Sequence, residues 1–143
     1  MDVLIAPIGP QLQAVNEVAR KELIVSSQNC SKYGYGAYTG EVTVEHLLDL
    51  GLDTTLIGHS ERRHIFGETD QDIAEKVKRC QDLNVDVVLC IGELLEEREA
   101  GKTMDVNGRQ LEACLSSIKD WSKIVIAYEP VWAIGTGVVA TTE

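Results

Sequence analysis

The chain is poor in aromatic residues, has no surplus of basic residues and contains no long apolar run. Aromatics make up 5% of its 143 residues, and 23 acidic side chains outnumber 13 basic ones, for a net charge of −10. This balance argues against nucleic-acid binding, which needs clustered lysine and arginine. The apolar runs are far shorter than the roughly 20 residues of a membrane-spanning helix, so we expect no membrane partner.

The cysteines also exclude some classes of protein. The chain has four of them, Cys30, Cys80, Cys90 and Cys114, without the close spacing of metal ligands. We therefore expect reduced thiols in a cytoplasmic protein and no metal site. Cys90 lies in an apolar run, which indicates a small buried residue more than a nucleophile.

Five short runs rich in valine, isoleucine and leucine are present, and they do not alternate with polar residues. This pattern is typical of parallel strands buried on both faces. Helical patterns separate the runs. Gly101 interrupts the last of these patterns, and Asn107-Gly108 within the same pattern favours a turn, so we expect two helical pieces there. The predicted strands are Val3–Ala6, Leu23–Ser26, Thr54–Ile57, Val85–Cys90 and Ile124–Ala127, and the predicted helices fall within Gln11–Arg20, Val44–Leu50, Asp70–Leu83 and Glu93–Ile118.

Two of the predicted strands end in residues suited to proton transfer. The last strand leads to Glu129, and the following loop is stiffened by Pro130 and loosened by Gly135 and Gly137, as in a lid over a base. The third strand leads to His59 and a short charged helix start. Singly, a histidine at a strand end is often only a partly buried polar residue, and Gly-Thr-Gly is often only a turn. Their occurrence together indicates a catalytic site.

The segments Gly58-His59-Ser60-Glu61-Arg62-Arg63 and Tyr128-Glu129-Pro130-Val131-Trp132-Ala133-Ile134-Gly135-Thr136-Gly137 resemble the triosephosphate isomerase family. The resemblance implies an isomerase of glycolysis and gluconeogenesis that interconverts dihydroxyacetone phosphate and glyceraldehyde 3-phosphate without a cofactor. It assigns Glu129 as the base, His59 as the electrophile and the backbone N–H of Gly135 as a donor to the substrate phosphate. Closure of such a lid, for which this family is itself a standard example, shields the reaction from water.

Length limits this interpretation, because a complete (β/α)8 barrel takes about 250 residues. We therefore expect an α/β fold that is a partial TIM (β/α)8 barrel, with five parallel strands and intervening helices. It would form a single truncated domain over residues 1–143, resembling the second to sixth strands. In the family, the missing strands carry a lysine and a Gly-Gly phosphate grip. The isolated chain is therefore expected to be inactive.

The stretch from Asn29 to Glu41 is rich in glycine and tyrosine and is long for a strand-to-helix connection. We expect it to protrude. In the family, the matching loop inserts into a twofold partner, which implies a homodimer through the loop around Thr39. The alternative is a flexible surface loop.

Other interpretations remain open from the sequence. Five strands with helices also suit a noncatalytic doubly wound α/β interaction module, in which the strand order changes direction. Self-association through open sheet edges is a third possibility. Glu93 also follows a predicted strand, but no lid-like loop comes after it, so we interpret it as a structural carboxylate.

Overall fold

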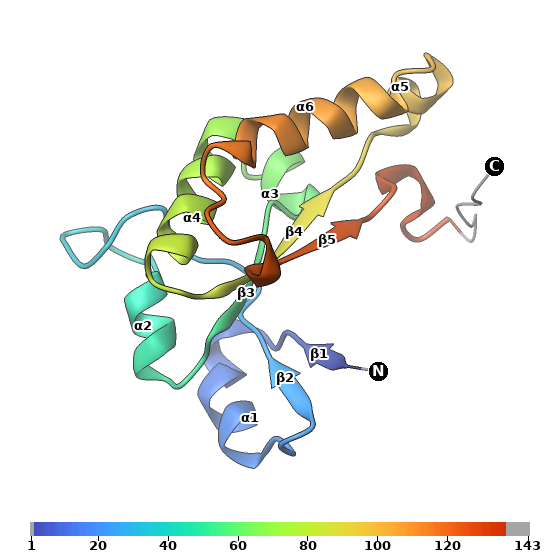
Figure 1. Ribbon diagram of the computed structural model, residues 1–143. Helices are drawn as coiled ribbons and strands as arrows, with labels where there is room; N and C mark the ends of the chain where they lie inside the picture. The colour runs from blue at the N-terminus through green and yellow to red at the C-terminus, as the bar shows by residue number, and fades with distance from the viewer. Residues whose placement is uncertain (1, 137–143) are drawn as a thin grey trace.

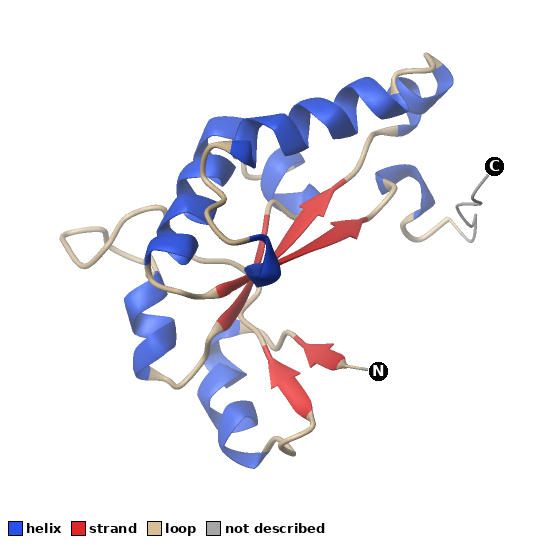
Figure 2. Ribbon diagram, viewed as in Figure 1, coloured by secondary structure: helices blue, strands red, loops and turns tan. Residues whose placement is uncertain are grey.

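The computed structural model of the chain describes residues 2–136 and contains five parallel strands (Figures 1 and 2). All five predicted strands are confirmed to within two residues at each end. They pair as β1–β2 and as β3–β4–β5. Their bounds are β1 Val3–Ile5, β2 Leu23–Val25, β3 Thr54–Ile57, β4 Asp86–Ile91 and β5 Ile124–Tyr128.

The strands follow one another in space in the order of the sequence. Ser27, just after β2, forms a parallel bridge with Thr55 of β3. The Ser27 N–H donates to the Thr54 carbonyl at 3.2 Å, and the Leu56 N–H donates to the Ser27 carbonyl at 3.0 Å. These contacts join the two sheets without a change of direction. This is the order of a barrel segment, so the doubly wound alternative, which requires a reversal, is wrong.

Six α-helices lie between the strands, and the four longest form an arc outside them (Figure 1). Thr43 and Thr69 begin α2 and α4 with capping boxes, in which the threonine side chain and the third helical residue satisfy each other's backbone N–H groups. The helices are α1 Leu12–Val18, α2 Val44–Asp49, α3 Ser60–His64, α4 Asp70–Asp82, α5 Leu95–Glu99 and α6 Thr103–Leu115, with short 3-10 turns η1 Gly9–Gln11, η2 Trp121–Lys123 and η3 Val131–Ala133.

The predicted turn at Asn107-Gly108 is wrong, because both residues lie inside α6. A glycine inside a helix costs only about 1 kcal/mol. This helix also buries Val106, Gln110 and Cys114, and packing of such a face stabilises a helix more than local propensity does. The predicted division at Gly101 is confirmed, since α5 ends before it and α6 begins after it.

The side of the sheet that faces the helices holds the core. Ile57 and Leu89 are neighbours in register and are fully buried, but Ile126 of β5, next in the same row, is exposed. On the opposite face Val88 is half-buried and Val125 is 61% exposed. Burial therefore falls toward β5 on both faces of the sheet.

The segment between β2 and α2 protrudes from the rest of the fold, as predicted (Figure 1). Tyr33 and Tyr38 stack with ring centroids 4.3 Å apart, and the Tyr35 hydroxyl donates to Asp49 of α2. These tyrosine contacts hold the loop in a defined conformation. Within residues 2–136, no helix combines the length and apolarity needed to cross a membrane.

Candidate active site

The chain turns sharply between β3 and α3, and this turn places His59 at the start of the helix. Gly58 has a φ of +78°, and a Cβ there would lie 3.1 Å from the Cys90 carbonyl oxygen, so a larger residue would be strained. His59 is the N-cap of α3, and its Nδ1 accepts the backbone N–H of Glu61 at 3.3 Å. The predicted position of His59 at a helix start is therefore correct.

Glu129 follows β5 and reaches the same helix start. Its backbone N–H donates to the Ile91 carbonyl at 2.8 Å, which continues the pairing with β4. One carboxylate oxygen accepts the Ser60 N–H at 2.7 Å, and the other lies 3.1 Å from Nε2 of His59. The two side chains are 31% (His59) and 21% (Glu129) exposed. The structure thus brings together two residues that are 70 positions apart in the sequence.

The hydrogen bonds define the proton positions on His59. Because Nδ1 accepts a backbone N–H, it carries no proton, and the ring proton is assigned to Nε2, which donates to Glu129. This is a neutral imidazole.

Arg63 holds the ends of β3 and β4 together. Its side chain is only 7% exposed, and it donates to the carbonyls of Gly58 at 2.7 Å and Cys90 at 3.1 Å and to Asp70 at 2.8 Å. Sequence reasoning missed this role. The doublet Arg62-Arg63 was visible, but nothing in it distinguishes the inward-facing arginine from its neighbour.

Gly92 allows the backbone after β5 to approach the end of β4. A Cβ at this position would lie 1.9 Å from the carbonyl oxygen of Glu129, a distance that no side chain tolerates. Gly92 therefore positions the backbone of Glu129. Glycine at a site of close backbone approach is a recognised pattern, but the approaching segment is 37 residues away and is invisible in the sequence.

A cavity of about 590 Å³ opens beside the histidine and the carboxylate. The described residues that line it include no lysine or arginine; they are His59, Ser60, Glu61, His64, Ile65, Leu94, Glu129, Val131 and Ile134. Gly135 has a positive φ, +71°, but it is exposed and does not line the cavity, whereas its neighbour Ile134 does. Gly137 lies outside the described residues.

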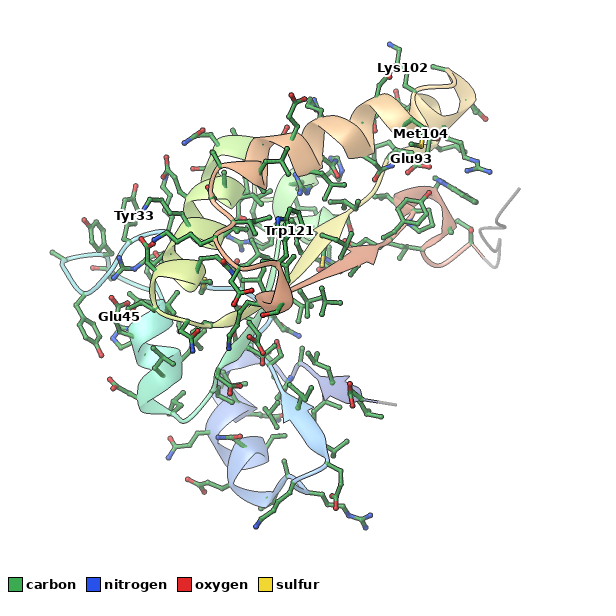
Figure 3. The ribbon with its side chains drawn as sticks, in the orientation of Figure 1. Tyr33, Glu45, Glu93, Lys102, Met104 and Trp121 are labelled. Carbon is green, nitrogen blue, oxygen red and sulfur yellow. The ribbon has the colours of Figure 1, made fainter. Side chains whose placement is uncertain are left out.

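Glu93 is the other acid at a strand end, and its surroundings differ. It is fully buried and accepts hydrogen bonds from the Tyr128 hydroxyl at 3.0 Å, the Trp132 indole at 3.0 Å and the Asn107 amide at 3.1 Å. Burial alone would raise the pKa of Glu93, but the hydrogen bonds from Trp132, Asn107 and Tyr128 outweigh it and leave the pKa lowered. Its contacts are those of a structural carboxylate, as the sequence suggested. Figure 3 shows Glu93 beside α6.

The cysteines show no sign of nucleophilic chemistry at this site. Burial, and secondarily the negative charge of Glu129, raise the pKa of Cys90 to about 12, so its thiol stays protonated. Among residues 2–136, no three histidine, cysteine, aspartate or glutamate side chains gather as a metal ion would require.

The parallel strands in sequential order, the outer helices and the polar residues at the carboxyl ends of the strands define a segment of a (β/α)8-barrel protein, a class whose active sites lie at that end. The family model described as triosephosphate isomerase matches residues 1–143. The chain belongs to the triosephosphate isomerase family.

Relatives of this chain carry the same family name. The triosephosphate isomerase of Debaryomyces hansenii is 55% identical over 144 residues and that of Emericella nidulans 50% over 145, each match covering 100% of this chain and 58% of the relative. A chloroplastic triosephosphate isomerase of Secale cereale is 48% identical, with 48% of its length covered. The chain thus spans about half the length of the relatives it matches, from 48% to 58%.

Proposed function

We propose that this chain supplies the proton-transfer groups of a triosephosphate isomerase, which interconverts dihydroxyacetone phosphate and D-glyceraldehyde 3-phosphate. Glu129 is the base and His59 the electrophile. The contact of 3.1 Å between His59 Nε2 and the Glu129 carboxylate, at the wall of the cavity, is the observation that carries the proposal.

The chemistry follows from the two groups. The Glu129 carboxylate removes a proton from the carbon beside the substrate carbonyl, and the electron pair of the broken C–H bond forms the C=C bond of an enediolate. The carbonyl oxygen gains negative charge and receives the Nε2 proton of His59. The Glu129 carboxyl then returns its proton to the former carbonyl carbon, while the imidazolate left on His59 takes the proton of the other hydroxyl and becomes neutral imidazole again. The carbonyl has moved by one carbon, and no atom is gained or lost.

A neutral ring suits this role. The enediolate oxygen needs a donor that can give a proton and take one back, which an N–H of neutral imidazole can do. Substrate must first replace the hydrogen bond between His59 and Glu129, so the carboxylate has to leave its contacts with His59 and Ser60 before it can reach a carbon.

Phosphate binding is the part of the reaction that these residues support least. A phosphate dianion in the cavity would meet the carboxylates of Glu61 and Glu129, with no cation among the described lining residues. On this proposal the lid backbone, with the N–H of Gly135, supplies one donor, and further groups must come from outside residues 2–136. We therefore expect little activity from the isolated chain.

We also propose a homodimer formed through the loop around Thr39. Thr39 is exposed, and the exposed ring of Tyr38 is stacked in place on Tyr33, which gives a protruding loop with a preformed aromatic surface. A cytoplasmic location is part of the same proposal, and the four unpaired cysteines support it.

The catalytic roles can be tested by completing the barrel with the remaining segment of the Debaryomyces hansenii relative. His59→Gln should lower kcat by about 100-fold or more, the usual contribution of a positioned proton donor. His64→Gln is the matched control, because His64 lines the same cavity without touching Glu129, and it should change kcat little. Equal losses in the two variants would refute the role of His59.

A further inference from the structure

Two buried cysteines lie side by side outside the cavity of the candidate active site. The sulfur atoms of Cys30 and Cys80 are 3.8 Å apart, although the residues are 50 positions apart in the sequence. Cys30 is 2% exposed and Cys80 is fully buried. Neither residue has a part in the proposed isomerase reaction.

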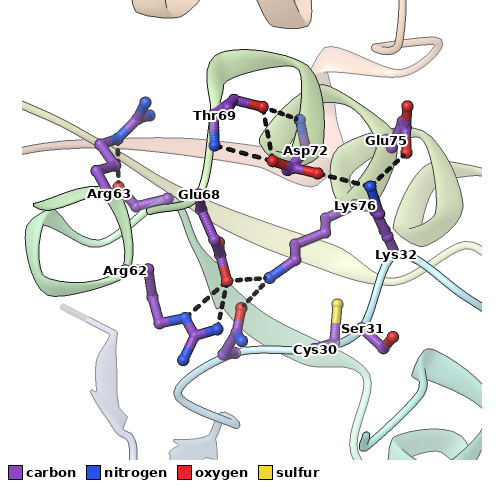
Figure 4. A network of polar contacts seen from close by, with 12 residues as sticks. Cys30, Ser31, Lys32, Arg62, Arg63, Glu68, Thr69, Asp72, Glu75 and Lys76 are labelled. Carbon is purple, nitrogen blue, oxygen red and sulfur yellow. Dashed lines mark hydrogen bonds and ion pairs between the residues drawn. The ribbon is translucent and has the colours of Figure 1, made fainter. Parts of the chain in front are cut away.

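The pair sits where the protruding loop begins to pack on α4. Asn29, next to Cys30, accepts a hydrogen bond from the Lys76 ammonium at 3.0 Å, and Lys76 lies one helical turn before Cys80. Figure 4 shows Cys30 beside the network formed by Lys76 and Glu68. The loop and the helix are thus already held together by polar contacts. A disulfide has an S–S distance of about 2.05 Å, so closing it would need a movement of less than 2 Å in total.

Cys30 can also be reached by a small molecule. It lines a cavity of about 480 Å³ whose walls are mostly apolar and include Pro7, Pro10, Leu12, Leu47 and Leu50. A small uncharged oxidant can enter such a cavity, whereas a charged or bulky one is disfavoured. Cys80 does not line the cavity.

We propose that Cys30 and Cys80 are a peroxide-sensitive thiol pair that is converted into an intrachain disulfide by a hydroperoxide. The Cys30 thiolate attacks one peroxide oxygen, the O–O bond breaks, and the hydroxide released takes a proton to become water. The resulting sulfenic acid of Cys30 is attacked by Cys80; the S–S bond forms, the S–O bond breaks, and a second water leaves. With hydrogen peroxide, two thiols and one peroxide give one disulfide and two waters.

The surroundings set the order of the two cysteines. The hydrogen bond with Cys30, together with burial, holds the pKa of Cys80 well above its usual range, so Cys80 is a poor first nucleophile. Cys30, on the cavity wall, meets the oxidant first, and Cys80 resolves the sulfenic acid. The product ties the base of the protruding loop covalently to α4.

Mass spectrometry of the unmodified 143-residue chain tests the proposal. After treatment with hydrogen peroxide and alkylation of the remaining thiols, a protease that cleaves before aspartate separates the four cysteines into peptides 2–48, 72–81, 86–104 and 105–119. We expect 2–48 linked to 72–81, in at least about tenfold excess over any other linked pair. The same treatment in urea should give mixed pairings.

Two variants separate the proposed order from a chance pairing. In Cys80→Ser, Cys30 should stop at the sulfenic acid and be captured by dimedone, whereas Cys114→Ser, which removes another buried cysteine, should leave the linkage intact. In the oxidised chain, proteolysis within residues 31–43 should slow by at least about tenfold. The disulfide holds the base of the loop on α4, so the loop opens to the protease less often. Linkages dominated by Cys90 or Cys114, or four thiols left unmodified in the native chain, would overturn the proposal.

Discussion

Glu93 and Glu129 occupy equivalent places in the chain and opposite environments in the fold. Each follows a parallel strand, Glu93 two residues after β4 and Glu129 one residue after β5. Glu93 is fully buried and surrounded by the donors of Tyr128, Trp132 and Asn107. Glu129 is partly exposed to a cavity and accepts one backbone N–H and the His59 ring proton.

The difference shows what separates a structural carboxylate from a candidate base. A carboxylate whose oxygens are saturated by fixed donors cannot turn toward a substrate without leaving those donors buried and unpaired, which costs about 1–3 kcal/mol for each one. Glu129 has only two such contacts and faces open volume. Strand-end position alone therefore does not separate the two acids, whereas the number of donors around each carboxylate does, and it supports the proposal of Glu129 as the base.

The largest expected effect compares the two acids directly in the completed barrel. Glu129→Gln should lower kcat by about 1000-fold or more, because the amide cannot accept the carbon-bound proton. Glu93→Gln should change kcat by less than about tenfold and act mainly on stability, since Glu93 touches no cavity that holds His59. Steady-state kinetics decide between them. Loss of activity in the Glu93 variant with activity retained in the Glu129 variant would reverse the assignment.

The backbone beneath Glu129 gives the next largest effect. Gly92→Ala would place a Cβ against the Glu129 carbonyl, so β4 and β5 must separate; we expect a loss of about 4 kcal/mol in the free energy of unfolding. Gly108→Ala is the matched control, because a Cβ there meets nothing within 4 Å and α6 gains about 0.5–1 kcal/mol in helix propensity. Urea denaturation measures both. A Gly92 variant as stable as wild type would show that the strand ends are not tightly packed.

Removing one donor from Glu93 should have a moderate effect. Trp132→Phe keeps an aromatic ring near Arg98 but deletes the indole N–H bonded to Glu93, and should cost about 1–3 kcal/mol. Because Trp132 follows Glu129 in the lid, the variant should also change kcat and KM together. Trp121→Phe controls for loss of a tryptophan, since the Trp121 side chain is exposed, and it should be nearly neutral. Equal destabilisation by the two changes would contradict the importance of the Glu93 contact.

The smallest expected effect is a pH dependence of stability. The pKa of Glu93 is lowered in the folded chain, so the unfolded chain binds the proton more readily. Glu93 therefore stabilises the fold above the usual glutamate pKa of about 4.5, and this stabilisation is lost as the pH falls from there toward the folded pKa. Other carboxylates add their own acid dependence. The difference between wild type and Glu93→Gln, measured by urea denaturation from neutral pH to about pH 3, isolates the contribution of Glu93. A difference that does not change with pH would contradict it.

Much of the architecture was predictable because it depends on local patterns. The five strands are continuous apolar runs, and the predicted helix Asp70–Leu83 is present as α4 Asp70–Asp82. The strand order could be established only from the structure, because the same five apolar runs are compatible with a sequential order and with an order that reverses direction. The error at Asn107-Gly108 has a related cause: packing of α6 against its neighbours outweighs a local turn preference.

Lys76 illustrates a buried residue that sequence patterns cannot find. It lies on the face of α4 that also carries Ile73 and Val77, is 5% exposed, and forms an ion pair with Glu68. A lysine in a helical pattern is ordinarily assigned to the solvent side. Its burial depends on Asn29 and Glu68, which come from other segments of the chain.

The alternation of strands and helices and the two strand-end motifs that contain His59 and Glu129 can be predicted from the sequence, because chain-local spacing and residue type set these features. The folded chain is needed to see which groups surround each carboxylate, that Arg63 and Gly92 position the strand ends, and that Cys30 meets Cys80. These features depend on the approach of segments that are tens of residues apart. Close packing determines which of these segments touch, and no local pattern along the chain records such contacts.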